Sequence, residues 1–253
     1  MIIISKKLFL KNVLVLFEDD KVPEIIKNGH YSRVIVSSYN KLDLEGFSLK
    51  IKTTALIDLD QDLETIFSKF SDTTRNEIRK TYKNQGLSFQ FLKSISEEVH
   101  QLYKEFEYLQ GRVPVGKKNL KNCLFFGAYY NNELISGIYV MALGKYLRIR
   151  SIFSRRLKLE DKEKIKVISN ASRRIVWEIV QWGRKNSYQC LDLASVNFKN
   201  PKTANITKFK MSFAGRVVEE YTYTYNSALY KTAEKIAKWK NKVFKWKNKV
   251  FKK

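Results

Sequence analysis

The sequence predicts an α+β fold, with a mixed, mainly antiparallel sheet, helices on both faces, and a basic amphipathic helix at the C-terminal end. Three observations carry this prediction. Residues 123–153 read as three strands joined by two short turns, which is typical of an antiparallel meander. A strongly helical segment precedes the short apolar run Cys190–Val196, as expected for a buried strand that follows a crossover helix. Residues 238–251 repeat one heptad of tryptophan, valine and lysine.

The composition is that of a globular, strongly basic protein. Among 253 residues, 44% are hydrophobic, which excludes an intrinsically disordered chain. The 48 lysines and arginines exceed the 25 aspartates and glutamates, and the net charge is +23. A field of this sign attracts phosphates, nucleic acid or anionic lipid without distinguishing among them.

The cysteines and histidines do not form a metal-binding pattern. Cys123 and Cys190 lie in apolar runs, which predicts core thiols in a reducing compartment. Together with His30 and His100 they lack the spacing of zinc ligands, so we expect no metal site. No apolar stretch approaches the ~18 residues of a membrane span, and the N-terminal residues lack the order of a signal peptide. The expected location is the cytoplasm, including the inner face of the membrane.

The N-terminal segment, residues 1–57, is predicted to be rich in β-structure. Its strands are expected at Lys11–Phe17, Arg33–Tyr39 and Phe47–Ala55, separated by turn-forming residues.

Two helices follow, over residues 62–70 and 72–86. In the second, Arg75 and Arg79 are one turn apart on one face. Because the guanidinium fork suits phosphate, this pair is a candidate substrate clamp. The alternative is a solvated helix face that pairs with neighbours such as Glu77.

The centre of the chain supplies the meander and an arginine-rich strand face. The predicted elements are the strand Leu87–Leu92, the helix Ser96–Leu109 and the strands Cys123–Tyr130, Leu134–Leu143 and Tyr146–Phe153. Arg150 alternates with Arg148 on the last strand, and we take it as a candidate substrate-binding residue.

The crossover helix is expected to begin at Ser169 or Asn170 and to run to Asn186. The free amides of its first turn, at Ser169, Asn170 and Ala171, are candidate ligands for a cofactor phosphate. The alternative is that these amides bind only water.

A polar loop that contains Asn205 follows the buried strand, and a short helix is predicted from Ile206 to Ser212. Phe209 and Phe213 share one face of that helix, and Lys208 and Lys210 project elsewhere, beside the end of the strand. Ligands of open α/β sheets bind at the carboxyl ends of strands, so a lysine at this place is a candidate site residue. The alternative is a solvated lysine on an amphipathic turn.

The C-terminal segment, residues 227–253, carries ten lysines and one glutamate. Trp239, Val243, Trp246 and Val250 form a stripe at heptad spacing. A basic amphipathic helix with tryptophan is typical of a membrane-surface helix, and we expect contact with an anionic membrane surface. The alternatives are packing against the body of the protein and contact with nucleic acid.

The order of these elements resembles that of the GNAT acyltransferases. It is more specifically similar to the Fem-type aminoacyltransferases and the acetyltransferase-6 domains. Three stretches within residues 58–220 carry the resemblance. The first, Leu59–Phe67 with Arg75–Lys80 and Gly86, is similar to the family's helix pair, and the second, Asn170–Tyr188 with Leu191–Ser195, is similar to its crossover helix and "DLGG" strand. The third, Asn205–Gly215, is similar to its "FKxxFGG" segment. The resemblance implies a GNAT-like domain over residues 58–226.

The sequence departs from the family pattern at specific positions. Ala194 and Ser195 stand where a pair of glycines is usual, and Ala214 stands where the first of two glycines is usual. The loop before the crossover helix lacks the glycine-rich pyrophosphate motif of acetyl-CoA enzymes. Fem-type relatives lack this motif as well, so its absence puts acetyl-CoA in doubt as the donor without excluding an acyltransferase.

The resemblance places Lys210 at the reaction centre, where its ammonium would stabilise the oxyanion formed when an amine attacks a carbonyl. Phe209 and Asn205 would lie beside it and contact substrate. Asp192 is a candidate proton acceptor, and a structural role at the strand end is the alternative.

The implied activity is N-acyl transfer with acyl-CoA or aminoacyl-tRNA as co-substrate and no tightly bound cofactor. The expected acceptor is an amine of an anionic cell-envelope precursor, such as a nucleotide- or lipid-linked peptidoglycan sugar or peptide. The expected partners are therefore this precursor, tRNA as the alternative to CoA, and an anionic membrane surface. A function of another class is a non-catalytic GNAT-fold protein that binds nucleic acid or an anionic membrane surface.

Overall fold

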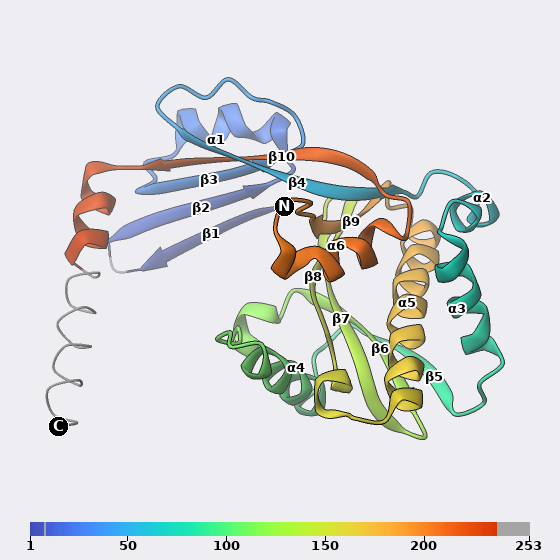
Figure 1. Cartoon of the computed structure of the whole chain (residues 1–253). Coiled ribbons are helices and arrows are strands. Elements are labelled where there is room, and N and C mark those ends of the chain that lie inside the picture. Colours follow the sequence, from blue (N-terminus) through green and yellow to red (C-terminus); the bar gives the residue numbers. More distant parts are fainter. Residues whose placement is uncertain (8, 237–253) are drawn as a thin grey trace, which may run out of the picture. The chain divides into compact units, whose positions relative to one another are not determined.

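The computed structural model describes residues 1–7 and 9–236 (Figure 1). Its contacts divide the chain into two compact units, one made of residues 1–52 with those from 219 onward, the other of residues 53–218. The chain passes between the units inside two strands, β4 (Ser48–Asp58) and β10 (Arg216–Asn226). The domain boundaries at residues 57/58 and 226/227 stay predictions.

The unit of residues 53–218 is built on a sheet in the order β4-β9-β8-β7-β6-β5. Its strands beside β4 are β5 (Leu87–Leu92), β6 (Cys123–Tyr130), β7 (Glu133–Leu143), β8 (Tyr146–Ser154) and β9 (Cys190–Ser195). Its helices are α2 (Leu63–Ser68), α3 (Asp72–Tyr82), α4 (Glu97–Leu109), α5 (Lys162–Lys185) and α6 (Ala204–Met211).

The pairing of these strands confirms the predicted mixed, mainly antiparallel sheet. β5, β6, β7 and β8 are joined in antiparallel pairs, so the predicted meander is present. β9 pairs antiparallel with β4 and parallel with β8. A parallel neighbour requires a crossover connection, and α5 provides it.

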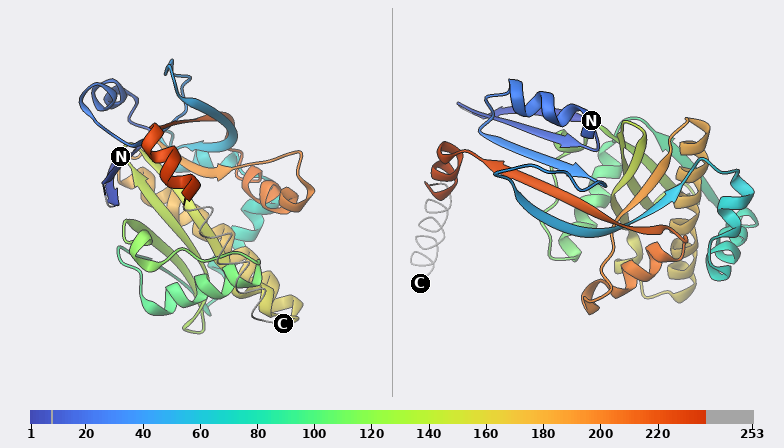
Figure 2. Two further views of the ribbon diagram at one scale, coloured as in Figure 1. Left: turned by 90° about the vertical axis from the view of Figure 1, so that its left-hand side faces the viewer. Right: turned by 90° about the horizontal axis from the view of Figure 1, so that it is seen from above.

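Helices cover both faces of this sheet, as predicted. On one face α3 and α5 lie side by side (Figure 2). Arg173 of α5 pairs with Glu77 of α3 at 2.9 Å. The core beneath them contains Ile78, Ile175 and Leu191. On the other face α4 packs against a second, aromatic core that contains Tyr103, Phe125, Tyr139 and Phe153.

The start of α5 corrects one expectation. The helix begins after Asp161, whose carboxylate accepts from the backbone N–H groups of Glu163 and Lys164. Asp161 is therefore the N-cap, and Ser169 lies well inside the helix. The charged residues 162–166 offer little apolar periodicity, so the sequence pattern hides this first part of α5.

In the unit that contains the N-terminal residues, the strands lie in the order β1-β2-β3-β10, which is one end of the ten-stranded sheet. The additional elements are β1 (Ile2–Lys7), β2 (Leu10–Leu16), β3 (Arg33–Ser38) and α1 (Val22–Asn28). Val22 at the start of α1 belongs to a small core with Val13, Val36 and Tyr223. β1 and α1 were not predicted, whereas β2 and β3 were.

Residues 228–236 are helical. The predicted stripe of Trp239, Val243, Trp246 and Val250 lies outside the described residues. No helix in the described part of the chain combines the length and apolar character needed to cross a membrane.

Candidate functional site

The most unusual side chain of the larger unit is Lys210, on α6. It is only 8% exposed, and its Nζ donates to the backbone carbonyl of Ser195 at 2.8 Å. Burial lowers the pKa of Lys210 to about 8, although the nearby carboxylate of Asp192 acts in the opposite direction. The pKa of Lys210 is thus closer to neutral pH than that of a solvent-exposed lysine.

Asp192 anchors the site from β9. Its side chain is fully buried, and its Oδ2 pairs with Nη1 of Arg148 at 2.7 Å. Its Oδ1 accepts from the hydroxyl of Thr54 and from the backbone N–H of Ala194, the latter at 2.7 Å. Both oxygens are engaged, an arrangement that fits the structural alternative for Asp192 better than the role of proton acceptor.

Two alanines, one near the end of β9 and one after α6, have positive φ angles. Ala194 has φ = 62°, in the left-handed region, and Ala214 after α6 has φ = 52°. The turn at Ala194 directs the carbonyl of Ser195 towards Lys210. These two positions, where alanine stands in place of a glycine of the resembled pattern, therefore carry a conformational cost, since alanine is disfavoured in the left-handed region by about 1–2 kcal/mol.

The site lies at the carboxyl end of the parallel strand pair. β8 and β9 are paired from Tyr146–Cys190 to Arg148–Asp192. Beyond that point the register between β8 and β7 shifts, because Val140 pairs with Ile149 whereas Tyr139 pairs with Ser151. The strands stop pairing where Asp192 and Arg148 meet, which is where open sheets bind their ligands.

Two of the predicted substrate-binding residues lie on α6. Asn205 is exposed in the first turn of the helix. The ring of Phe209 packs against Phe213, with centroids 5.3 Å apart, and the guanidinium of Arg173 lies 5.3 Å from the Phe209 centroid. Phe209 is thus a packing residue beside a cation, on the same helix as Lys210.

The arginines predicted to bind substrate are not brought together. Arg75 donates to the carbonyl oxygens of Ser68 and Phe70 and pairs with Asp72. Its guanidinium thus bonds to the residues that precede and begin α3. This agrees more with the alternative, a helix face that pairs with its neighbours, than with a substrate clamp. Arg79 lies over the ring of Phe67, 5.5 Å from its centroid.

Arg150 is exposed near the irregularity of β8. Its charge acts on the thiol of Cys123, on β6. Its role in substrate binding stays a prediction.

The proposed phosphate ligands Ser169, Asn170 and Ala171 do not form a helix N-terminus. They lie in the interior of α5, where backbone amides are taken up by intrahelical bonds. The hydroxyl of Ser169 donates to the carbonyl of Ile165, and Ala171 is fully buried. The expectation of free amides at these positions is wrong, because the helix starts earlier.

Two residues of the site had no assigned role in the sequence. In the sequence, Arg148 is one of several alternating residues of a predicted strand, and no pattern indicates a role for Thr54. Both matter because of where β8 and β4 run, on either side of β9. Within residues 1–7 and 9–236, no group of three or more histidine, cysteine, aspartate and glutamate side chains could hold a metal ion.

Comparisons with known proteins support the fold. Neither a family model nor a curated protein matches the sequence. The solved structures of L-PGS from Bacillus licheniformis and of FemX are similar to this chain. For L-PGS the TM-score is 0.55 at 16% identity, covering 90% of this chain and 81% of the other. For FemX the TM-score is 0.64 at 11% identity, covering 91% and 85%.

A third similar structure is a C-terminal domain from Agrobacterium fabrum described as that of a lysylphosphatidylglycerol synthetase. Its TM-score is 0.55 at 14% identity, and the match covers 94% of this chain and 84% of the other. The chain therefore has a GNAT/Fem-type fold.

Proposed function

We propose that the protein transfers an acyl or aminoacyl group to an amine of a cell-envelope component. The observation that carries this proposal is Lys210, a buried ammonium beside the carboxyl end of a parallel strand pair in a GNAT/Fem-type fold. The Fem-type resemblance and the similar structures bring the envelope into the proposal, because they include FemX and a lysylphosphatidylglycerol synthetase domain.

The chemistry asked of the site is simple. The acceptor nitrogen forms a bond to the carbonyl carbon of a thioester or ester, and the carbonyl oxygen takes up negative charge. The C–S or C–O bond then breaks, the leaving group departs with that electron pair, and the nitrogen gives up a proton. Lys210 supplies positive charge to the oxyanion, a contribution worth roughly 100–1,000-fold in rate when a single donor is removed.

The ammonium of Lys210 has capacity for this role. It carries three N–H donors, and Ser195 accepts from one of them. Because Asp192 is engaged on both oxygens, the proton acceptor in this proposal is the substrate itself or another carboxylate or tyrosine. The ion pair between Asp192 and Arg148 holds the end of β9 in place. The carbonyl of Ser195, at that end of the strand, accepts from Lys210 and so positions its ammonium.

The donor is either acyl-CoA or aminoacyl-tRNA, and both carry phosphates that suit a protein of net charge +23. The first experiment measures binding of acetyl-CoA and of charged and uncharged tRNA at about 50 mM and about 300 mM salt. The salt series is needed because a basic protein holds any polyphosphate when screening is weak.

Each outcome selects one function. Salt-resistant binding of CoA indicates an acyl-CoA transferase. Salt-resistant tRNA binding that requires the aminoacyl group indicates an aminoacyltransferase. Loss of both at high salt removes the donor and favours the non-catalytic binding protein.

A further inference from the structure

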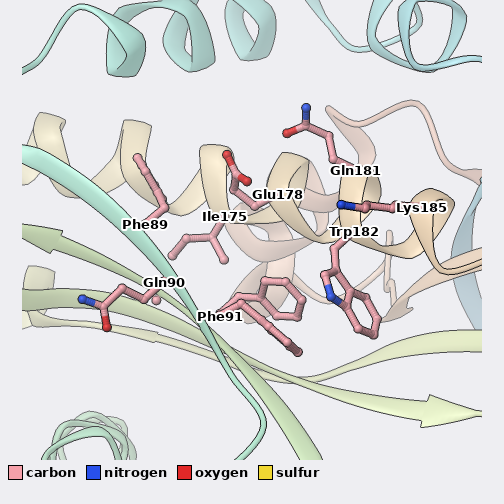
Figure 3. Close-up of a pocket in the computed structure, with 10 residues that line it drawn as sticks. Phe89, Gln90, Phe91, Ile175, Glu178, Gln181, Trp182 and Lys185 are labelled. Atoms are coloured by element: carbon pink, nitrogen blue, oxygen red, sulfur yellow. The ribbon is translucent and has the colours of Figure 1, made fainter.

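A groove lies on the α5 face of the larger unit, over β5 and β6. Lys210 bonds to the end of β9, and in the strand order β8 and β7 lie between β9 and β6. The groove has a volume of about 310 Å³ and is walled by β5, β6 and α5 (Figure 3). Four aromatic residues and one aliphatic residue line it: Phe89, Phe91, Phe126, Trp182 and Ile175. This size and lining match the small end of ligand pockets, about 300–1,000 Å³.

The aromatic wall is a fixed surface. Phe91 lies 5.1 Å from Trp182 and 4.9 Å from Phe126, between ring centroids. Trp182 in turn stacks on Tyr188 at 5.6 Å. Each ring is held by its neighbours, so the groove is formed before any ligand enters it.

The second feature of the groove is the strand that borders it. Among the strands that the structure describes, β5 is the last of the sheet and pairs with β6 alone. In an antiparallel pair, alternate residues of an edge strand direct their N–H and C=O groups away from the partner. Phe89 and Phe91 point to the α5 side, and Gln90 points away from it (Figure 3). Gln90 therefore borders the groove through its backbone.

The charge of the groove comes from α5. Glu178 is neutralised by Arg174, whose Nη2 lies 2.5 Å from the carboxylate. Lys185 is exposed, and in the described part of the chain it has no ion-pair partner. One uncompensated ammonium thus remains at the groove, which favours a ligand with a negative charge near its apolar part.

We propose that this groove binds an extended, acidic peptide segment, which adds as a strand to the free edge of β5. A groove between an edge strand and a helix is a geometry by which domains recognise peptides, with main-chain hydrogen bonds for affinity and a pocket for specificity. One apolar side chain of the peptide packs on the wall that Phe91, Trp182 and Ile175 form. A carboxylate of the peptide pairs with Lys185. This site is separate from the transfer site and stands whether or not the proposed function holds.

The test uses the full chain and fluorescein-labelled seven-residue peptides. Each peptide alternates threonine with valine and carries phenylalanine or leucine at its centre. One aspartate replaces a residue on the N-terminal side of the centre in one set of peptides and on the C-terminal side in the other. Fluorescence anisotropy gives the Kd, and the experiment is run at about 150 mM salt so that non-specific attraction to a +23 protein is weakened.

Two matched comparisons identify the binding mode. Lys185→Glu is expected to weaken binding about fivefold to tenfold, and Lys164→Glu, the same charge change at an exposed position of α5 outside the groove, leaves it within about twofold. A peptide N-methylated at alternate residues, which removes the donors that would face β5, is expected to bind at least tenfold more weakly than the parent.

The proposal is overturned by any of three results. These are an absence of saturable binding up to about 1 mM peptide, equal binding of the N-methylated peptide, and equal loss in Lys185→Glu and Lys164→Glu. Saturable binding of fluorescein-labelled AMP or octanoate, with no binding of any peptide, would overturn it as well and assign the groove to a nucleotide or to an acyl chain.

Discussion

Lys210 on α6 and Ser195 at the end of β9 are joined by one hydrogen bond of 2.8 Å, from the ammonium to a backbone carbonyl. This bond ties the short helix to the strand across a polar loop. It also fixes the ammonium where the parallel strands stop pairing, so its position depends on the turn at Ala194 as well as on α6.

The first prediction concerns Lys210 itself. Lys210→Ala is expected to lower the transfer rate by about 100–1,000-fold, because the oxyanion loses its charged donor. The rate is measured in single turnover with whichever donor resists salt. Lys208→Ala is the matched control, since Lys208 is an exposed lysine on the same helix, and it should retain the wild-type rate. A loss of less than about threefold in Lys210→Ala would rule out the oxyanion role.

The second prediction uses the lowered pKa of Lys210, about 8 against an ordinary 10.5. Between these values the unfolded chain holds a proton that the folded chain has lost, so the free energy of unfolding rises with pH. Relative to Lys210→Met, which lacks the titrating group, the wild type should gain about 1–2 kcal/mol between pH 7.5 and pH 9.5. Urea unfolding of both proteins at the two pH values measures this. A constant difference would show that the pKa of Lys210 is not lowered.

The third prediction concerns the buried pair of Asp192 and Arg148. Asp192→Asn leaves the guanidinium of Arg148 without its counter-charge, and we expect a loss of about 3–5 kcal/mol in the free energy of unfolding. Because that loss reflects an unpaired buried charge, Asp192→Asn combined with Arg148→Met should recover a large part of it. A double-mutant cycle by urea unfolding gives the coupling. Additive losses from the two substitutions would mean that the pair does not stabilise the fold as a unit.

The fourth prediction concerns the two alanines with positive φ. Ala194→Gly and Ala214→Gly should each raise the free energy of unfolding by about 0.5–1 kcal/mol. Relief of the left-handed conformation, about 1–2 kcal/mol, exceeds the entropic cost of glycine, about 0.5–1 kcal/mol. The control is Ala171→Gly, at a buried helical position of α5, which should destabilise. A decrease in both turn variants would contradict the argument.

Local patterns were sufficient for the part of the fold where neighbouring segments pair. The meander β6–β8 was predicted almost to the residue, because alternation and short turns define both the strands and their register. β9 and α6 were also placed correctly, since an apolar run and two phenylalanines four residues apart mark them.

Long-range contacts limited the rest. The start of α5 depends on the cap at Asp161, in a charged stretch without apolar periodicity. The roles of Arg148 and Thr54 depend on which strands flank β9, and the sequence order does not show this. Lys210 was found because the resemblance singled it out, whereas its burial and its bond to Ser195 follow only from the turn at Ala194.

The pairing of β10 with β3 joins residues 221–226 to residues 33–38. During synthesis, β3 leaves the ribosome long before its antiparallel neighbour exists. At about 5–20 residues per second, the wait is on the order of 10 s or more. For that time the edge of β3 that later pairs with β10 has no native partner, and it is exposed to association with other chains. We therefore expect the slow, aggregation-sensitive stage of biogenesis to be the pairing of β10 with β3, while residues 53–218 can already be folded.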